Sequence, residues 1–89
     1  MKDVSNFKNG AFYIKDGHQR TYVKVVEDQP DCILGIDFYI GTTSVRQMVS
    51  NPILWIKSLH SWERIQNIEN YVKFVRTRKI SEENRILIN

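Results

Sequence analysis

CILGIDFYI, residues 32–40, is the stretch that decides how this chain is expected to fold. Apolar side chains alternate along it, which is typical of a β-strand with one face on a hydrophobic core. The members of this apolar row are Cys32, Leu34, Ile36, Phe38 and Ile40. Because successive strand side chains point to opposite faces, residues 33, 35, 37 and 39 are expected to face away from that core.

Two shorter alternating stretches come before it, at residues 11–15 (AFYIK) and 21–28 (TYVKVVED). The pair Asp16-Gly17 between them is a strong signal for a tight β-hairpin turn. A proline-containing turn separates the second stretch from the third. The sequence therefore predicts a three-stranded antiparallel meander over residues 11–40.

The second half of the chain carries signals for helices. Ser44 and Gln47 have the spacing of a capping box, and Asn51-Pro52 is a second helix start. These signals predict two short helices, or one helix kinked at Pro52. The side chains expected to face inward from the second helical segment are those of Leu54, Trp55 and Leu59.

The C-terminal third supports two interpretations. Ile65, Ile68, Val72 and Val75 recur at helical spacing, which favours a helix over residues 62–76. The composition of YVKFVRT favours a strand over residues 71–80 instead, and residues 82–88 could form either structure.

The predicted fold class is α+β, as a single domain over residues 1–89. In this arrangement the meander at 11–40 is covered on one face by a mainly helical second half at 44–76. A short C-terminal element could follow.

Composition narrows the class of protein further. The chain has 89 residues, a net charge of +3, 42% hydrophobic and 26% charged residues, which is typical of one small globular domain. Cys32 is the only cysteine, so no internal disulfide can form, and a reducing compartment is expected.

The polar start and the absence of a long apolar run predict a cytoplasmic protein without membrane association. The abundance of Ile, Asn and Lys beside a single Ala suggests an AT-rich genome, as in a phage or bacterial accessory protein.

The chemistry of an enzyme is not visible in the sequence. His18, Cys32 and His60 lack the spacing of metal ligands, and the glycines form no phosphate-binding loop. Asp37 lies in mid-strand, where pairing with Lys24 on the neighbouring strand would explain it. We therefore predict no catalytic residue, no metal and no cofactor.

The tyrosines of the meander suggest a binding surface. If the row at 32–40 faces the core, strand alternation should bring tyrosines and lysines together on the outer sheet face. This surface would consist of Tyr13, Tyr22, Tyr39, Lys15 and Lys24. Such a surface could anchor a partner protein or stack on single-stranded nucleic acid, although it could also simply face solvent. Trp55 and Trp62 either pack in the core or anchor a partner or a second copy of the chain.

Residues 71–79, YVKFVRTRK, suggest the alternative of nucleic-acid binding. Its cations are Lys73, Arg76, Arg78 and Lys79. Neither a helix nor a strand gathers all four into one stripe, so a solvated face is the simpler interpretation. The predicted function is thus a small non-enzymatic protein-binding module, an adaptor or an inhibitor of a larger protein. Nucleic-acid binding is the alternative, and a small enzyme is a distant third.

Overall fold

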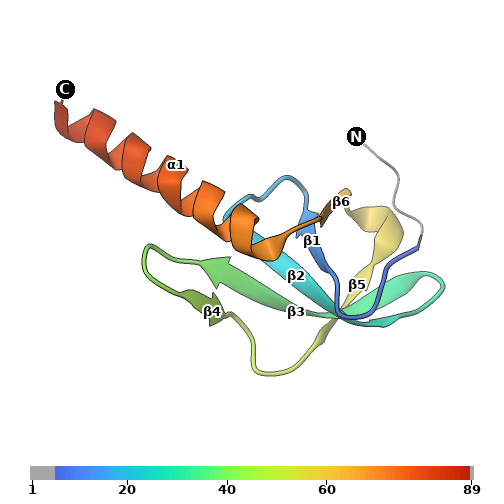
Figure 1. Ribbon diagram of the computed structural model, residues 1–89. Helices are drawn as coiled ribbons and strands as arrows, with labels where there is room; N and C mark the ends of the chain where they lie inside the picture. Colours follow the sequence, from blue (N-terminus) through green and yellow to red (C-terminus); the bar gives the residue numbers. More distant parts are fainter. Residues whose placement is uncertain (1–5, 89) are drawn as a thin grey trace.

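The computed structural model describes the backbone of residues 6–88 and the side chains of residues 6–78. Within that range a small antiparallel sheet is followed by one long helix (Figure 1). The elements in chain order are β1 (Phe12–Lys15), β2 (Thr21–Asp28), β3 (Cys32–Ile40), β4 (Val45–Gln47), β5 (Ile53–Ile56), the single-turn 3₁₀ helix η1 (Lys57–Leu59), β6 (Trp62–Ile65) and α1 (Ile68–Ile88).

The predicted meander is confirmed. Strands β1, β2 and β3 pair antiparallel in sequence order. Asp16 and Gly17 begin the loop over residues 16–20 that joins β1 to β2, and their φ angles of 56° and 72° lie in the left-handed region. The local turn signal and the alternating strands agree, so this part of the fold could be predicted from the sequence.

The predicted helical second half is wrong. Residues 45–47 and 53–56 are strands that pair with the two ends of β3, and residues 62–65 are a strand beside β1. One edge of the nine-residue β3 is paired with β2, and the backbone groups on its other edge also need hydrogen-bond partners. Strands β4 and β5 provide these partners, and this pairing overrides the local helix-start signals.

The helix begins later than predicted and runs further. Its first residue is Ile68, and it includes both residues 71–80 and residues 82–88, where a strand had been an alternative. The Asn67 side chain accepts a hydrogen bond from the Asn70 N–H at 3.0 Å and so caps the helix start. Only the first part of α1 lies against the sheet, and the rest projects beyond it (Figure 1).

The sheet carries a hydrophobic core on each face. The order of strands is β4-β3-β2-β1-β6, with β5 sharing an edge of β3 with β4. One core, on what we call the inner face, contains Phe7, Tyr13, Val23, Val25, Ile33 and Trp62. The other core, on the outer face, contains Ile14, Tyr22, Ile40 and Ile65 together with Val75 of α1.

The prediction that only one face of β3 is buried is wrong, because the sheet has a core on each face. The expected row does bury Ile40 on the outer face, but Ile33 on the opposite face is fully buried as well. A strand that is covered on both faces reads as a nearly continuous apolar run. The alternation in CILGIDFYI therefore identified the strand correctly and could not identify a single buried face.

Candidate functional site

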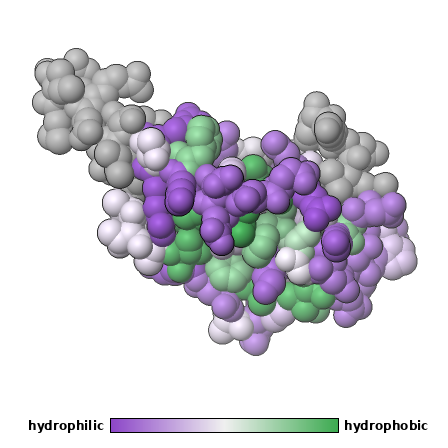
Figure 2. Space-filling model, in the orientation of Figure 1, coloured by the Kyte–Doolittle hydropathy of each residue, from purple (hydrophilic) through white to green (hydrophobic). Residues whose placement is uncertain are grey.

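Helix α1 leaves part of the outer face uncovered. It packs near Phe38 and Ile40 at one end of β3, while the other end of the sheet keeps its apolar side chains accessible. We call this region the open apolar surface; it consists of Val26, Leu34, Ile36, Leu54 and Ile56. Figure 2, in the orientation of Figure 1, shows hydrophobic side chains gathered on the molecular surface beside more polar ones. Contiguous exposed apolar residues commonly mark an interaction site.

Strand β5 is the centre of this surface. Leu54 and Ile56 are 57% and 50% exposed, and they lie opposite Leu34 and Cys32 of β3. The neighbouring Trp55 points to the inner face, opposite the buried Ile33. The strand therefore exposes one of its faces and buries part of the other.

The outer edge of β5 has no strand beside it in the described part of the chain. The Lys57 N–H donates to the Asp31 carbonyl at 2.9 Å and continues the ladder with β3. Because backbone groups alternate in direction along an antiparallel ladder, those of Leu54 and Ile56 point away from β3. Lysine, proline or a bulge in an edge strand usually prevents it from pairing with another chain. The four residues of β5 (ILWI) include no lysine and no proline.

A bulge in β2 adds Val26 to the same surface. The pairing of β2 with β3 shifts register between Val25 and Glu27. As a result Val25 is fully buried whereas Val26 is 41% exposed. An extra residue in one strand of a pair is the usual way in which a bulge redirects a side chain.

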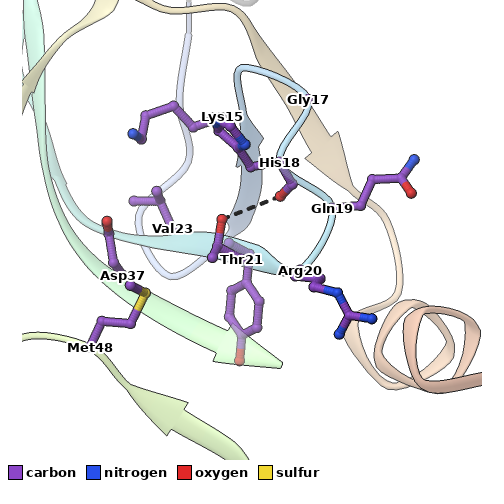
Figure 3. Close-up of a pocket in the computed structure, with 10 residues that line it drawn as sticks. Lys15, Gly17, His18, Gln19, Arg20, Thr21, Val23, Asp37 and Met48 are labelled. Carbon is purple, nitrogen blue, oxygen red and sulfur yellow. Dashed lines mark hydrogen bonds between the residues drawn. The ribbon is translucent and has the colours of Figure 1, made fainter. Parts of the chain in front are cut away.

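A second candidate site is a hollow of about 450 Å³ beside the β1–β2 turn, which we call the hairpin groove (Figure 3). Its lining residues are Lys15, Gly17, His18, Gln19, Arg20, Thr21, Tyr22, Val23, Asp37 and Met48. In the turn, the Thr21 hydroxyl donates to the His18 carbonyl at 3.3 Å and holds the loop that forms one wall. The groove therefore combines charged and hydroxyl groups from the hairpin and from β3.

Asp37 is the only carboxylate that lines the hairpin groove. Desolvation raises its pKa, while the Lys15 ammonium and the Trp55 indole N–H oppose that rise. Lys15 Nζ lies 4.0 Å from the centre of the Trp55 ring. The Trp55 indole N–H and Asp37 Oδ1 are both buried and have no hydrogen-bond partner among the described residues. The expected pairing of Asp37 with Lys24 is wrong, because Lys24 lies opposite Ile36 on the other face.

Arg20 is another of the lining residues of the groove. Its Nη1 atom is buried and has no hydrogen-bond partner among the described residues. Its carbonyl accepts the Ile40 N–H at 2.8 Å, which fixes the backbone of Arg20 beside the end of β3. In Figure 3 the Arg20 side chain extends toward α1 and away from Asp37.

Two arginines of α1 reach the same end of the sheet. Arg76 Nε donates to the Gly41 carbonyl at 3.2 Å, and Arg78 Nη1 donates to Gln19 Oε1 at 2.6 Å. Gln19 and Gly41 are the chain neighbours of Arg20 and of its partner Ile40. Of the other predicted nucleic-acid contacts, Lys73 is exposed, and the side chain of Lys79 lies outside the described residues.

The structure does not form the expected tyrosine surface. Tyr13 is 1% exposed in the inner core and Tyr22 is 6% exposed in the outer core, where it stacks on Phe38 at 5.1 Å. Tyr13 pairs with Val23, the residue after Tyr22, so the two tyrosines lie on opposite faces. Tyr39 is half-buried beside Arg46. A one-residue difference in register is enough to separate side chains that the sequence placed together.

The remaining predicted contacts are also mostly covered. Trp62 is 4% exposed, and its indole N–H donates to the Lys57 carbonyl at 3.1 Å. Trp55 and Lys15 are half-buried, and Lys24 alone of the predicted protein-binding residues is exposed. Sequence reasoning missed both the free edge of β5 and the buried Nη1 atom of Arg20, which has no hydrogen-bond partner among the described residues. Only the lack of charge in ILWI could have indicated the former.

Two further kinds of site were sought in the described residues, a metal centre and a membrane-spanning helix. No group of three or more His, Cys, Asp or Glu side chains there is arranged to hold a metal ion. None of the described helices has the length and apolar character needed to cross a membrane. Comparison with known proteins finds no matching family model, no curated relative and no similar solved structure. Any functional proposal must therefore be built from the geometry of the two candidate sites.

Proposed function

We propose that this protein is a small, non-enzymatic protein-binding module that takes an extended segment of a partner along β5. The observation that carries the proposal is the combination of a free strand edge with two half-exposed apolar side chains, Leu54 and Ile56. A strand added at this edge would pair with the outward backbone groups of those two residues. Main-chain pairing of this kind provides affinity, and the neighbouring side chains provide selectivity.

The chemistry of the partner segment follows from the two faces of β5. On the outer face its side chains would lie beside Leu54 and Ile56, so apolar residues are favoured there. On the inner face they would lie near Trp55, which is already half-buried and closely surrounded. The favoured partner is thus an extended segment with apolar residues at every second position.

The expected affinity is modest. Complete burial of one Leu or Ile side chain contributes about 1.5–3 kcal/mol, and about half of each side chain is already covered here. Association itself costs at least about 4 kcal/mol in lost freedom of motion. Main-chain hydrogen bonds and contacts with Val26 must supply the remainder, so a dissociation constant in the micromolar range is expected.

Selection from a library of displayed 12-residue peptides tests this proposal. Selected peptides should show alternating apolar residues, and their binding should protect the amide hydrogens of Leu54 and Ile56 from exchange. An Ile56→Lys variant should lose at least tenfold in affinity, because a charge at the edge opposes strand addition.

Phe74→Lys provides the matched control. Phe74 is 51% exposed on α1, close to the value for Ile56, but it lies away from β5. This variant should bind the selected peptides as the unchanged protein does. Peptides that bind both variants equally, or a library that yields no binder, would exclude the β5 edge as the binding site.

A further inference from the structure

We propose that the edge of β5 also pairs with the β5 edge of a second copy of this chain, which gives a two-fold symmetric antiparallel dimer. This inference rests on the proposed function, because it uses the same free edge and names one segment that binds there. The edge favours an extended segment with apolar residues at every second position, and β5 itself has Leu54 and Ile56 at that spacing. The chain therefore contains the kind of segment that its own edge takes.

The direction of the backbone groups determines the register of this dimer. The outward groups of β5 belong to Leu54 and Ile56, because the ladder with β3 uses the backbone groups of the residues between and beyond them. A two-fold axis beside Trp55 places Leu54 of each copy opposite Ile56 of the other. Each of these pairs exchanges both main-chain hydrogen bonds, and the half-exposed apolar side chains of both copies meet on the outer face.

The large side chain at the centre of β5 leaves this edge accessible. A Cβ atom at Gly35 of β3 would lie 3.8 Å from Trp55 Cδ1, and Lys15 Nζ of β1 lies 4.0 Å from the centre of the Trp55 ring. The indole therefore extends back across the inner face of its own sheet and away from the second copy. Helix α1 packs near the other end of β3, so it does not cover the edge either.

The distribution of charge favours β5 over the other strands as the partner of β5. Of the strands in the described part of the chain, β5 alone contains no charged residue. The strands at the two ends of the sheet, β4 and β6, expose the charged residues Arg46, Glu63 and Arg64. Charged side chains on an edge strand oppose the addition of another strand. The pairing of β5 with β5 is therefore the one that meets no charge within either strand.

Lys57, the first residue after β5, does not oppose this pairing. Its ammonium lies 2.7 Å from Asp28 Oδ1 and 5.2 Å from the centre of the Phe7 ring, so it is directed toward the inner core. In the proposed register the residue opposite Lys57 is Ile53 of the other copy. The two lysines are thus kept apart, and like charges do not meet across the two-fold axis.

The size of the contact determines the strength of the dimer. Each copy contributes a strand of four residues, which is about 13 Å long. Stable interfaces usually bury about 800 Å² on each partner, and a pair of such short strands buries less than that. We therefore expect a weak and reversible dimer, with a dissociation constant of about 10–100 μM.

Sedimentation equilibrium between about 2 μM and about 500 μM protein tests the dimer. The mean mass of the unchanged protein should rise from that of the monomer toward twice that value and no further, because a two-fold interface closes on itself. A protein that remains monomeric at the highest concentration would overturn the proposal. Growth beyond the dimer would also overturn it, since it would require a contact between two different surfaces.

Ile56→Lys should remain monomeric over the whole range, because it places a charge in each edge of the pair. Leu54→Lys provides the same test at a second position, should the first variant fail to fold, since Leu54 is 57% exposed. Phe74→Lys is the matched control, being 51% exposed on α1 and away from β5, and it should dimerise as the unchanged protein does. A folded edge variant that dimerises with unchanged affinity would place the contact elsewhere and contradict the proposal.

The register is tested by mixing isotope-labelled and unlabelled protein. Isotope-filtered nuclear Overhauser spectra at high concentration should show contacts between Leu54 of one copy and Ile56 of the other. Contacts from β5 to β4 or β6 of the second copy would exclude the symmetric pairing.

Peptide binding measured at about 2 μM protein, where the chain is expected to be monomeric, separates this inference from the proposed function. Selected peptides that bind at β5, with a free protein that never dimerises, would overturn the dimer alone. A dimer that forms through β5, with no peptide binding, would contradict the peptide-binding proposal alone.

Discussion

At the scale of single residues, Asp16 does more than form a turn. Its backbone adopts φ of 56°, and its N–H donates to the Ser61 carbonyl at 2.8 Å. Its Oδ1 atom accepts the Ser61 N–H at 2.9 Å, and its Oδ2 atom lies 2.8 Å from His60 Nδ1. One residue thus joins the first hairpin to the segment that leads into β6, more than forty positions later in the sequence.

These contacts predict an acid-dependent loss of stability. Hydrogen bonds from the Ser61 N–H and then from His60 lower the pKa of Asp16 below its ordinary value of 3.8. Because the folded-state pKa is the lower one, the stabilisation is complete above pH 3.8 and is lost as the pH falls through the folded value. The urea midpoint should therefore fall between pH 5.5 and pH 3, as measured by circular dichroism.

The control is Asp16→Asn, which tolerates the same left-handed backbone but cannot titrate. Its urea midpoint should depend less on pH across this range than that of the unchanged protein. An equal dependence in both proteins would assign the acid sensitivity to other carboxyl groups.

Gly35 is a second residue with a specific physical role. A Cβ atom at this position would lie 2.5 Å from Val23 Cγ1 and 3.3 Å from the Lys24 carbonyl oxygen. Gly35→Ala should therefore lower the free energy of unfolding by about 1–3 kcal/mol, the usual cost of overpacking a core. Urea unfolding measures this loss.

A double variant tests whether crowding is the cause. Val23→Ala removes the Cγ1 atom that the new methyl group would meet. The combined loss in Gly35→Ala/Val23→Ala should be smaller than the sum of the two single losses. Additive losses would show that crowding against Val23 is not responsible.

At the scale of elements, the first half of the chain was predictable and much of the second was not. Asp16-Gly17 and the alternation in residues 11–40 are local signals, and the strands they predict are present in the structure. Ser44 and Asn51 also carry local signals, but they were overridden by the pairing of β4 and β5 with β3. The backbone edge with which these strands pair belongs to β3, which is distant in the sequence. The residues immediately around Ser44 or Asn51 therefore do not predict the pairing.

The candidate sites show the same division. Asp37 could be recognised from the sequence as an unusual charge in mid-strand, whereas its partners Lys15 and Trp55 come from strands on either side of it in space. The tyrosine surface failed because it required the register between β1 and β2, which alternation alone does not determine.

The docking of α1 on the sheet predicts an alkaline transition. The Tyr71 hydroxyl donates to the Gln19 carbonyl, and burial, with a smaller effect of the Glu63 charge, raises the Tyr71 pKa to about 12. The neutral phenol is therefore favoured in the folded state. This contribution to stability is complete below the ordinary tyrosine pKa of about 10 and is lost as the pH rises toward 12.

Tyr71→Phe isolates this contribution. The variant should lose about 1 kcal/mol of unfolding free energy at neutral pH, the typical net value of one hydrogen bond. Between pH 9 and pH 11 its stability should fall less than that of the unchanged protein. A neutral-pH stability equal to that of the unchanged protein would show that the bond to Gln19 does not hold the helix in place.

At the scale of the whole molecule, a small chain builds two thin cores instead of one thick one. The inner core relies on three aromatic residues, Phe7, Tyr13 and Trp62. The centre of the Phe7 ring lies 4.7 Å from that of Tyr13 and 5.2 Å from that of Trp62. The outer core relies on α1, which covers only part of its face. The open apolar surface is thus a consequence of the architecture, since one helix cannot cover the whole sheet.

The projecting part of α1 has a practical consequence for experiments on either site. Residues 79–88 continue the helix, and at about 1.5 Å per residue they extend it by about 15 Å past Arg78. A fluorescent dye attached near residue 88 would therefore sit on a rod, clear of the sheet. Its polarisation would report the tumbling of the entire particle, and so the mass gained when a ligand associates, without the dye touching the surfaces under study.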